Sequence, residues 1–244
     1  MDRMAIKDLR GLFITGTDTG VGKTYVGALV ARALRGAGRS VGVYKPAASG
    51  CRRVDGRLES DDAAALWDAA GRPGTLDMVC PQTFAAPLAP HLAAKAEGRT
   101  LDPTLLRTGL EAWRGRCDIV LVEGAGGLLS PLGDDASVAD LAWDLGFPLV
   151  IVARNALGTI NHTLQTLVAA AAHRGGLDVA GIVLNSPSLL RDDPSVESNR
   201  AELERRARVP VLAEVAHGAD RFDADVDWHA LTRFPATHFS WRNV

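Results

Sequence analysis

Nine residues near the start of the chain have the types and spacing of a phosphate-binding loop. The run Gly16–Thr24 reads GTDTGVGKT, follows the apolar stretch 12–14 and precedes a helix-like segment. Glycines let successive backbone N–H groups surround phosphate oxygens, and the helix that follows adds its positive dipole end. Lys23 could then reach the β- and γ-phosphates, and the Thr24 hydroxyl could hold Mg²⁺. The alternative is a glycine-rich turn that binds nothing; the flanking elements and the Lys-Thr pair favour a triphosphate site of the P-loop NTPase type.

Two more groups at the ends of predicted strands could reach the same ligand. Lys45 follows the apolar stretch 40–44, with Ser49 close behind, and Glu123 follows the stretch 118–122. Only four of the 27 cationic residues are lysines, so a lysine at this point suggests that a compact positive charge is needed. Lys45 could neutralise a transferring phosphoryl group, and Glu123 could be a metal-directed carboxylate. The alternatives are a solvated lysine and an incidental acid in turns.

Asp61 and Asn185 are less specific. Asp61 lies in a Ser-Asp-Asp run before a helical pattern, where it could cap the helix or share the Mg²⁺. Asn185 ends a predicted strand, where its amide could bind an adenine edge or cap the following loop. Spacing alone leaves both alternatives open.

The elements that must position these residues alternate between strands and helices. The predicted strands span 11–15, 40–44, 118–122, 149–153, 181–184 and 211–215. The predicted helices span 24–35, 60–70, 103–113, 138–144, 158–174 and 195–206. This alternation predicts an α/β fold, a parallel sheet flanked by helices on both faces, with ligands at the carboxyl ends of the strands. Residues 71–99 and 186–194 are predicted loops, and the tail 217–244 has no assignable pattern.

Composition limits the classes of function. The chain has 244 residues, 47% of them hydrophobic, which favours a single domain over 1–244. A net charge of −2 without basic or acidic tracts argues against nucleic-acid and membrane-surface partners. The start of the chain has no signal-peptide pattern. The three cysteines lack metal-ligand spacing, which is typical of a cytoplasmic protein.

Together these motifs resemble those of the dethiobiotin synthetases. The matching segments are GTDTGVGKT (16–24), YKPAASG (44–50), SDD (60–62), TFAAPLAPHLAAKAEGR (83–99), VEGAGG (122–127), LGTINHT (157–163) and Asn185. They cover residues 11 to about 185. Five residues separate Gly16 from Gly22, one more than in the common phosphate-loop pattern, and this spacing is the usual form in that family.

The resemblance implies a defined reaction. ATP and Mg²⁺ would be required, and the substrates would be 7,8-diaminononanoate and CO₂. One amine would take up CO₂ as a carbamate, the γ-phosphate would transfer to it as a carbamic–phosphoric anhydride, and the second amine would close the cyclic urea of dethiobiotin. ADP and phosphate would be released.

The resemblance also assigns residues to roles. Lys23 and Lys45 would be catalytic. The nucleotide and its metal would be held by Gly20, Val21, Gly22, Lys23, Thr24, Tyr25, Asp61, Glu123 and Asn185, with Thr24, Asp61 and Glu123 as metal ligands. Arg208, Val209 and Glu214 are weaker candidates for the base and ribose. The diamine would contact Thr19 and Ser49, and its carboxylate would reach Leu157, Gly158 and Asn161 at a helix start of the partner subunit in a homodimer.

The chain departs from the family pattern at two positions. Some members have glutamate in place of Gly20, so an acidic contact is absent there. Some have a tyrosine that touches the substrate carboxylate, and a rough register places Asn199 at that position.

Two alternatives to the synthetase remain. One is a nucleotide switch of the septum-site or partition ATPase class, but that class has a lysine early in the loop, where this chain has Thr17 and Asp18. The other is a regulatory domain that has lost synthesis. The presence of Lys45, Ser49 and Glu123 argues against it.

Overall fold

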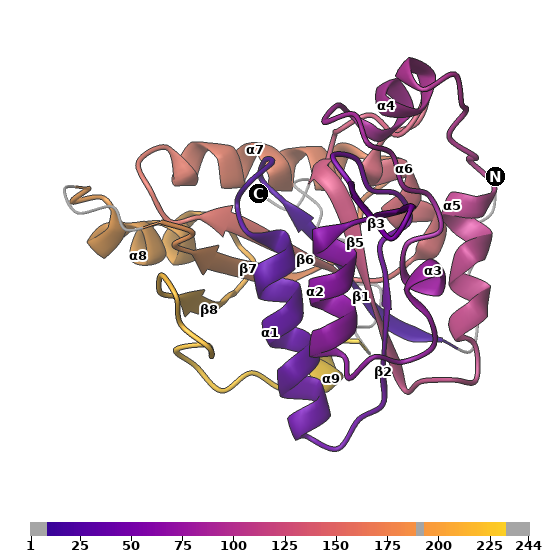
Figure 1. Ribbon diagram of the computed structural model, residues 1–244. Helices are drawn as coiled ribbons and strands as arrows, with labels where there is room; N and C mark the ends of the chain where they lie inside the picture. Colours follow the sequence, from indigo (N-terminus) through magenta and orange to yellow (C-terminus); the bar gives the residue numbers. More distant parts are fainter. Residues whose placement is uncertain (1–8, 189–192, 233–244) are drawn as a thin grey trace.

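Buried strands of nearly continuous apolar residues form the centre of the molecule (Figure 1). The computed structural model describes residues 9–188 and 193–232. Six strands of this described part form one parallel sheet in the order β2-β5-β1-β6-β7-β8. Their bounds are β1 Arg10–Gly16, β2 Val41–Tyr44, β5 Ile119–Gly127, β6 Leu149–Arg154, β7 Val179–Asn185 and β8 Val211–Val215. The predicted α/β class with a parallel sheet is confirmed.

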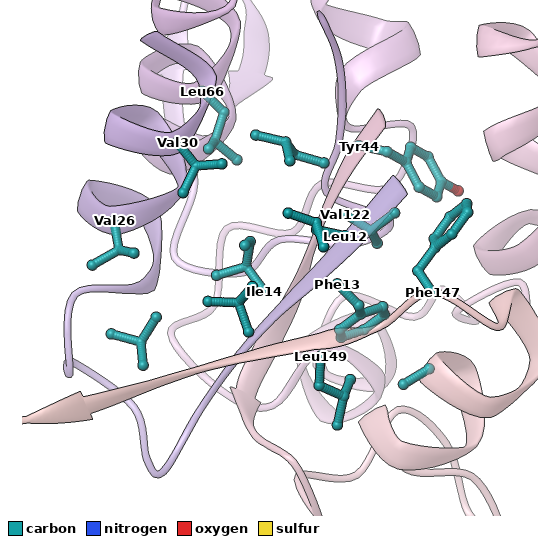
Figure 2. Packing of buried hydrophobic residues seen from close by; sticks show 14 of the residues in the cluster. Leu12, Phe13, Ile14, Val26, Val30, Tyr44, Leu66, Val122, Phe147 and Leu149 are labelled. Atoms are coloured by element: carbon teal, nitrogen blue, oxygen red, sulfur yellow. The ribbon is translucent and has the colours of Figure 1, made fainter. Parts of the chain in front are cut away.

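Successive residues of β1 face opposite layers of helices, as the two-residue period of a strand requires. A Cβ built on Gly27 of α1 (Lys23–Gly36) would lie 4.0 Å from Ile14 and 3.0 Å from Leu66. A Cβ built on Gly124 would instead lie 3.2 Å from Phe13, beside Val138 of α6 (Val138–Leu145). Figure 2 shows Ile14 turned toward α1. Both faces of the sheet are therefore covered.

The remaining helices flank this sheet. They are α2 Asp61–Ala69, α7 Thr159–Ala172 and α8 Val196–Arg206, with short helices α3 Leu76–Val79, α4 Pro90–Ala96, α5 Leu105–Thr108 and α9 Trp228–Leu231. In Figure 1, α1 and α2 lie side by side in front of the sheet. No helix in the described ranges is both long enough and apolar enough to cross a membrane.

Several segments differ from the sequence prediction. The stretch predicted as one long loop, 71–99, contains α3 and α4, which are too short to show a helical period. The hairpin of β3 (Arg52–Val54) and β4 (Arg57–Glu59) was not predicted, because its strands are only three residues long and mostly polar. The helix predicted over 103–113 is α5 followed by the 3₁₀ helix η1 (Gly109–Trp113). In the tail, α9 forms within 217–232, and 233–244 lie outside the described residues.

Candidate functional site

The phosphate loop joins the carboxyl end of β1 to the first turn of α1. Gly22 caps α1 in the left-handed region, at φ 92°, where a side chain is strained. A Cβ there would also lie 2.1 Å from Nδ2 of Asn185. That amide donates a 2.8 Å hydrogen bond to the Val21 carbonyl, so the end of β7 holds the loop in shape. The motif and Asn185 therefore form one structural unit.

A cavity of about 430 Å³ opens beside this loop. Most residues predicted to contact phosphate, metal or diamine line it. The lining consists of Thr19, Gly20, Gly22, Lys23, Thr24, Tyr25, Lys45, Ala47, Ala48, Ser49, Asp62, Glu123, Ala125 and Gly126.

Strand register explains why Lys45 meets Glu123. Tyr44 at the end of β2 pairs with Val122 in β5, so the next residue of each chain segment is also a neighbour. Lys45 Nζ donates to Glu123 Oε1 at 2.5 Å, and both side chains are buried. Burial alone lowers the pKa of Lys45, but attraction to Glu123 and Asp62 outweighs this effect and raises the pKa overall. Lys45 therefore remains protonated in the cavity.

The ammonium of Lys23 contacts a backbone carbonyl, whereas that of Lys45 contacts carboxylates. Lys23 Nζ donates to the Asp18 carbonyl at 3.0 Å, so the side chain lies along the loop. Burial lowers the pKa of Lys23; Glu123 opposes this effect and the nearby Lys45 adds to it. The two ammonium groups thus line one cavity with different partners.

Hard oxygen atoms suited to Mg²⁺ gather in the cavity. Thr24 Oγ1 donates to Glu123 Oε1 at 2.9 Å, and Asp62 Oδ2 lies 2.9 Å from Lys45 Nζ. Among the described residues nothing donates a hydrogen bond to Glu123 Oε2, although this carboxylate oxygen is buried. It faces α1, since a Cβ built on Gly27 would lie 3.7 Å from it, so Oε1 is the oxygen with contacts in the cavity. Two carboxylates and a hydroxyl are a typical protein share of a magnesium site completed by phosphate oxygens and water.

Asp62, and not the predicted metal ligand Asp61, lines the cavity. Asp61 forms an ion pair with Arg52 of the β3–β4 hairpin, and its side chain is 67% exposed outside the cavity. α2 begins at Asp61, so consecutive side chains point about 100° apart and only one can face the cavity. Asp62 is that residue. Burial raises the pKa of its carboxyl, but the nearby Lys45 ammonium lowers it overall.

Arg208 and Val209, the weaker candidates for the base and ribose, lie at the other end of the strands from the phosphate loop. They precede β8, so they lie at the amino end of a strand that runs parallel to β7. The phosphate loop follows the carboxyl end of β1, so it lies at the opposite end of the parallel strands. Glu214 lies near the carboxyl end of β8, which is the same end of the sheet as the phosphate loop. It lines a second cavity of about 400 Å³ together with Asn155, Ser186 and Phe222.

Three substrate candidates lie at the start of α7, away from the main cavity. Gly158 caps this helix at φ 94°, and Leu157 and Asn161 have exposed side chains. The Leu157 N–H donates to Asp193 Oδ2 at 2.8 Å, so one backbone donor of this turn already has a carboxylate partner within the chain.

Asn199 does not present its amide to the surface. Its side chain is buried in α8, and Nδ2 donates to Asn155 Oδ1 at 2.8 Å. The rough register places Asn199 where some family members have a substrate-binding tyrosine, and the structure shows a packing contact between α8 and the residue that follows β6.

The chain is similar to a family profile, to named proteins and to solved structures. A family profile described as an AAA domain matches residues 10–220. The ATP-dependent dethiobiotin synthetase of Rhodopirellula baltica is 44% identical over 83% of this chain and 82% of its own. That of Anaeromyxobacter dehalogenans is 50% identical over 84% of this chain and 89% of its own. Among solved structures, a ParA family ATPase from Chlorobium tepidum has a TM-score of 0.51 at 17% identity, covering 86% of this chain and 85% of that one. This structural similarity supports the fold alone.

Proposed function

The chain belongs to the dethiobiotin synthetase family, and we propose that it converts 7,8-diaminononanoate, CO₂ and ATP to dethiobiotin, ADP and phosphate. The family members named above are ATP-dependent synthetases, so the proposed activity is that of an ATP-dependent ligase. The observation that supports this proposal best is the cavity at the phosphate loop, where two lysines and two carboxylates converge.

In the proposed mechanism the substrate amines are the nucleophiles. One amine bonds to the carbon of CO₂ and loses a proton, giving a carbamate. A carbamate oxygen then attacks the γ-phosphorus and ADP leaves. The second amine attacks the carbamoyl carbon, loses a proton and expels phosphate, which closes the cyclic urea. The enzyme has to position and neutralise these groups rather than bond to them.

The side chains of the cavity provide this positioning. Lys45 and Lys23 would neutralise charge on the carbamate and the transferring phosphoryl group. Thr19 and Ser49 line the same cavity and would hydrogen-bond the diamine or its carbamate.

The cavity oxygens would hold Mg²⁺. We propose Thr24, Asp62 and Glu123 as the residues of this site, on the contacts described above. The ion would neutralise the phosphates and orient them for in-line transfer.

We place the nucleoside next to the loop, toward the second cavity. Asn185 and Glu214 lie at this end of the sheet. Tyr25 of α1 connects the loop to the second cavity, because its hydroxyl donates to the carbonyl of Ala219, which lines that cavity, at 2.6 Å. Asn185 already donates to Val21, so its amide would serve both the loop and the adenine.

We further propose a homodimeric, single-domain enzyme of the cytoplasm with small molecules as its ligands. The helix start at Leu157, Gly158 and Asn161 would receive the substrate carboxylate of the partner subunit through backbone amides other than that of Leu157, which donates to Asp193. Light scattering of the purified protein tests the dimer. The three cysteines are free, as a reducing compartment requires.

One assay tests the reaction. ATP hydrolysis should depend on both 7,8-diaminononanoate and bicarbonate, and mass spectrometry should detect the cyclic urea. ATP turnover indifferent to the diamine but stimulated by DNA or vesicles would instead support the partition or septum-site ATPase class.

A further inference from the structure

The Lys45 ammonium occupies the place among the cavity oxygens that a metal ion also needs. Lys45 Nζ lies 2.5 Å from Glu123 Oε1 and 2.9 Å from Asp62 Oδ2, and its side chain is 5% exposed. We infer that Lys45 competes with the divalent cation for these carboxylates, so that tight metal binding depends on an anionic ligand that draws Lys45 away. This inference rests on the proposed metal site.

The competition follows first from the geometry of Glu123. Its Oε1 accepts hydrogen bonds from both Lys45 and Thr24, which uses both lone pairs of that oxygen. Oε2 is buried on the side of α1, where a Cβ built on Gly27 would lie 3.7 Å from it. A metal ion in the cavity therefore meets Oε1 and has to replace at least one of these donors. The Thr24 hydroxyl can rotate and offer its own lone pair to the ion, whereas an ammonium has donors only and must leave.

The charge balance supports the same conclusion. The cavity lining contains two lysines and two carboxylates, which sum to zero net charge. A divalent cation added alone would leave an excess of two positive charges beside the buried Lys45 and Glu123, which is unfavourable. Phosphate or carbamate oxygens both cancel this excess and offer Lys45 new acceptors.

The side chain of Lys45 suits such an exchange. Lysine is a compact point charge on a flexible stem with three rotatable donors, so it can change partners without a backbone movement. The same movement would bring the ammonium to the reacting oxygens as the metal reaches the carboxylates. Metal and nucleotide would then bind with positive coupling, because each relieves a cost of binding the other.

Direct metal titration tests this inference without measuring catalysis. Mn²⁺ is a paramagnetic substitute for Mg²⁺, and free Mn²⁺ can be followed by EPR in titrations of the full chain at pH 8. The variant Lys45→Met removes the ammonium and keeps an unbranched side chain. Lys23→Met is the matched control, because Lys23 lines the same cavity but its Nζ donates to the Asp18 carbonyl instead of a carboxylate.

We expect Lys45→Met to bind Mn²⁺ at least ~10-fold more tightly than the natural chain when nucleotide is absent, since ions this close interact strongly at an intermediate dielectric. Lys23→Met should gain much less. With ADP present, and Mn²⁺–ADP complexes in solution accounted for, the natural chain should gain more Mn²⁺ affinity than Lys45→Met does.

Two results would overturn the inference. Unchanged Mn²⁺ affinity in Lys45→Met would mean that the ammonium and the ion do not compete. Equal gains in Mn²⁺ affinity in the two variants would mean that the loss of one positive charge, and not competition by Lys45, explains the tighter binding. Circular dichroism and thermal unfolding verify that each variant folds, and Lys45→Gln provides a polar substitute if Lys45→Met does not. The cyclic-urea assay is separate, so failure of the proposed reaction would leave a measured Mn²⁺ competition intact.

Discussion

Asp61 and Asp62 are adjacent in sequence, yet their carboxylates bind cations on different elements. Asp61 pairs with Arg52 on the exposed hairpin, and Asp62 pairs with Lys45 inside the cavity. The first turn of α2 thereby fixes the hairpin and contributes to the site through consecutive residues.

This difference predicts opposite outcomes for two conservative changes. Asp62→Asn should lower turnover and raise the Mg²⁺ concentration needed for half-maximal rate, each by at least ~10-fold, because substitutions around a metal commonly cost this much. Asp61→Asn should leave both quantities close to those of the natural chain. Steady-state kinetics at varied Mg²⁺ provides the measurement. If Asp61→Asn were the impaired variant, the assignment of Asp62 would be wrong.

Lys45→Ala should lower kcat by at least ~10²-fold, the scale for loss of one preorganised group that stabilises developing charge. Lys95→Ala is a suitable control, since Lys95 is an exposed lysine of α4. Near-normal turnover in Lys45→Ala would refute the catalytic role of this ammonium.

Asn199→Leu tests whether this residue serves packing or substrate binding. The change removes the donor to the buried Asn155 Oδ1 and should lower the free energy of unfolding by ~1–3 kcal/mol. Ser198→Ala, on the exposed side of the same helix, should change it by less than about 0.5 kcal/mol. Urea denaturation measures both. Unchanged stability combined with a raised KM for the diamine would instead indicate that Asn199 contacts the substrate, as the tyrosine does in some family members.

The burial of His173 predicts that the protein loses stability in mild acid. Burial lowers the pKa of this imidazole below its ordinary value of 6.5, with Asp140 opposing and Arg174 adding to the shift. Between 6.5 and the lower folded-state pKa, the unfolded chain binds a proton that the folded chain does not, so stability falls as the pH falls through this window. Denaturation at about pH 7.5 and 5.5 should show a smaller drop for His173→Gln than for the natural chain. An equal drop in both proteins would exclude His173 as the source.

The sequence predicted the parts of the fold and site that depend on local pattern. The six strands and the loop could be read from apolar runs and from the glycine and Lys-Thr spacing, because these are local requirements of buried strands and phosphate contacts. The lysine count selected Lys45 as a candidate, and the structure places Lys45 in the cavity.

Features that depend on strand register or on the direction of a side chain around a helix could not be predicted from local sequence patterns. The contact of Lys45 with Glu123 depends on the pairing of Tyr44 with Val122, which only the strand order defines. The choice between Asp61 and Asp62 depends on where α2 begins, and a shift of one residue turns a side chain by about 100°. Arg208 was assigned from the weakest part of the family resemblance, although the predicted strand 211–215 already placed it at the amino end of that strand.

The phosphate loop is contiguous in sequence, but its supporting contacts are distant. Thr24 meets Glu123 across 99 positions, and Val21 meets Asn185 across 164. During synthesis, a ribosome-bound fragment that ends before β7 contains the whole glycine-rich motif without the amide that holds its shape. Non-local contacts of this kind form late and slow folding. The earliest part of the chain to be made is thus among the last to become competent for nucleotide, and ligand binding can stabilise only the nearly complete polypeptide.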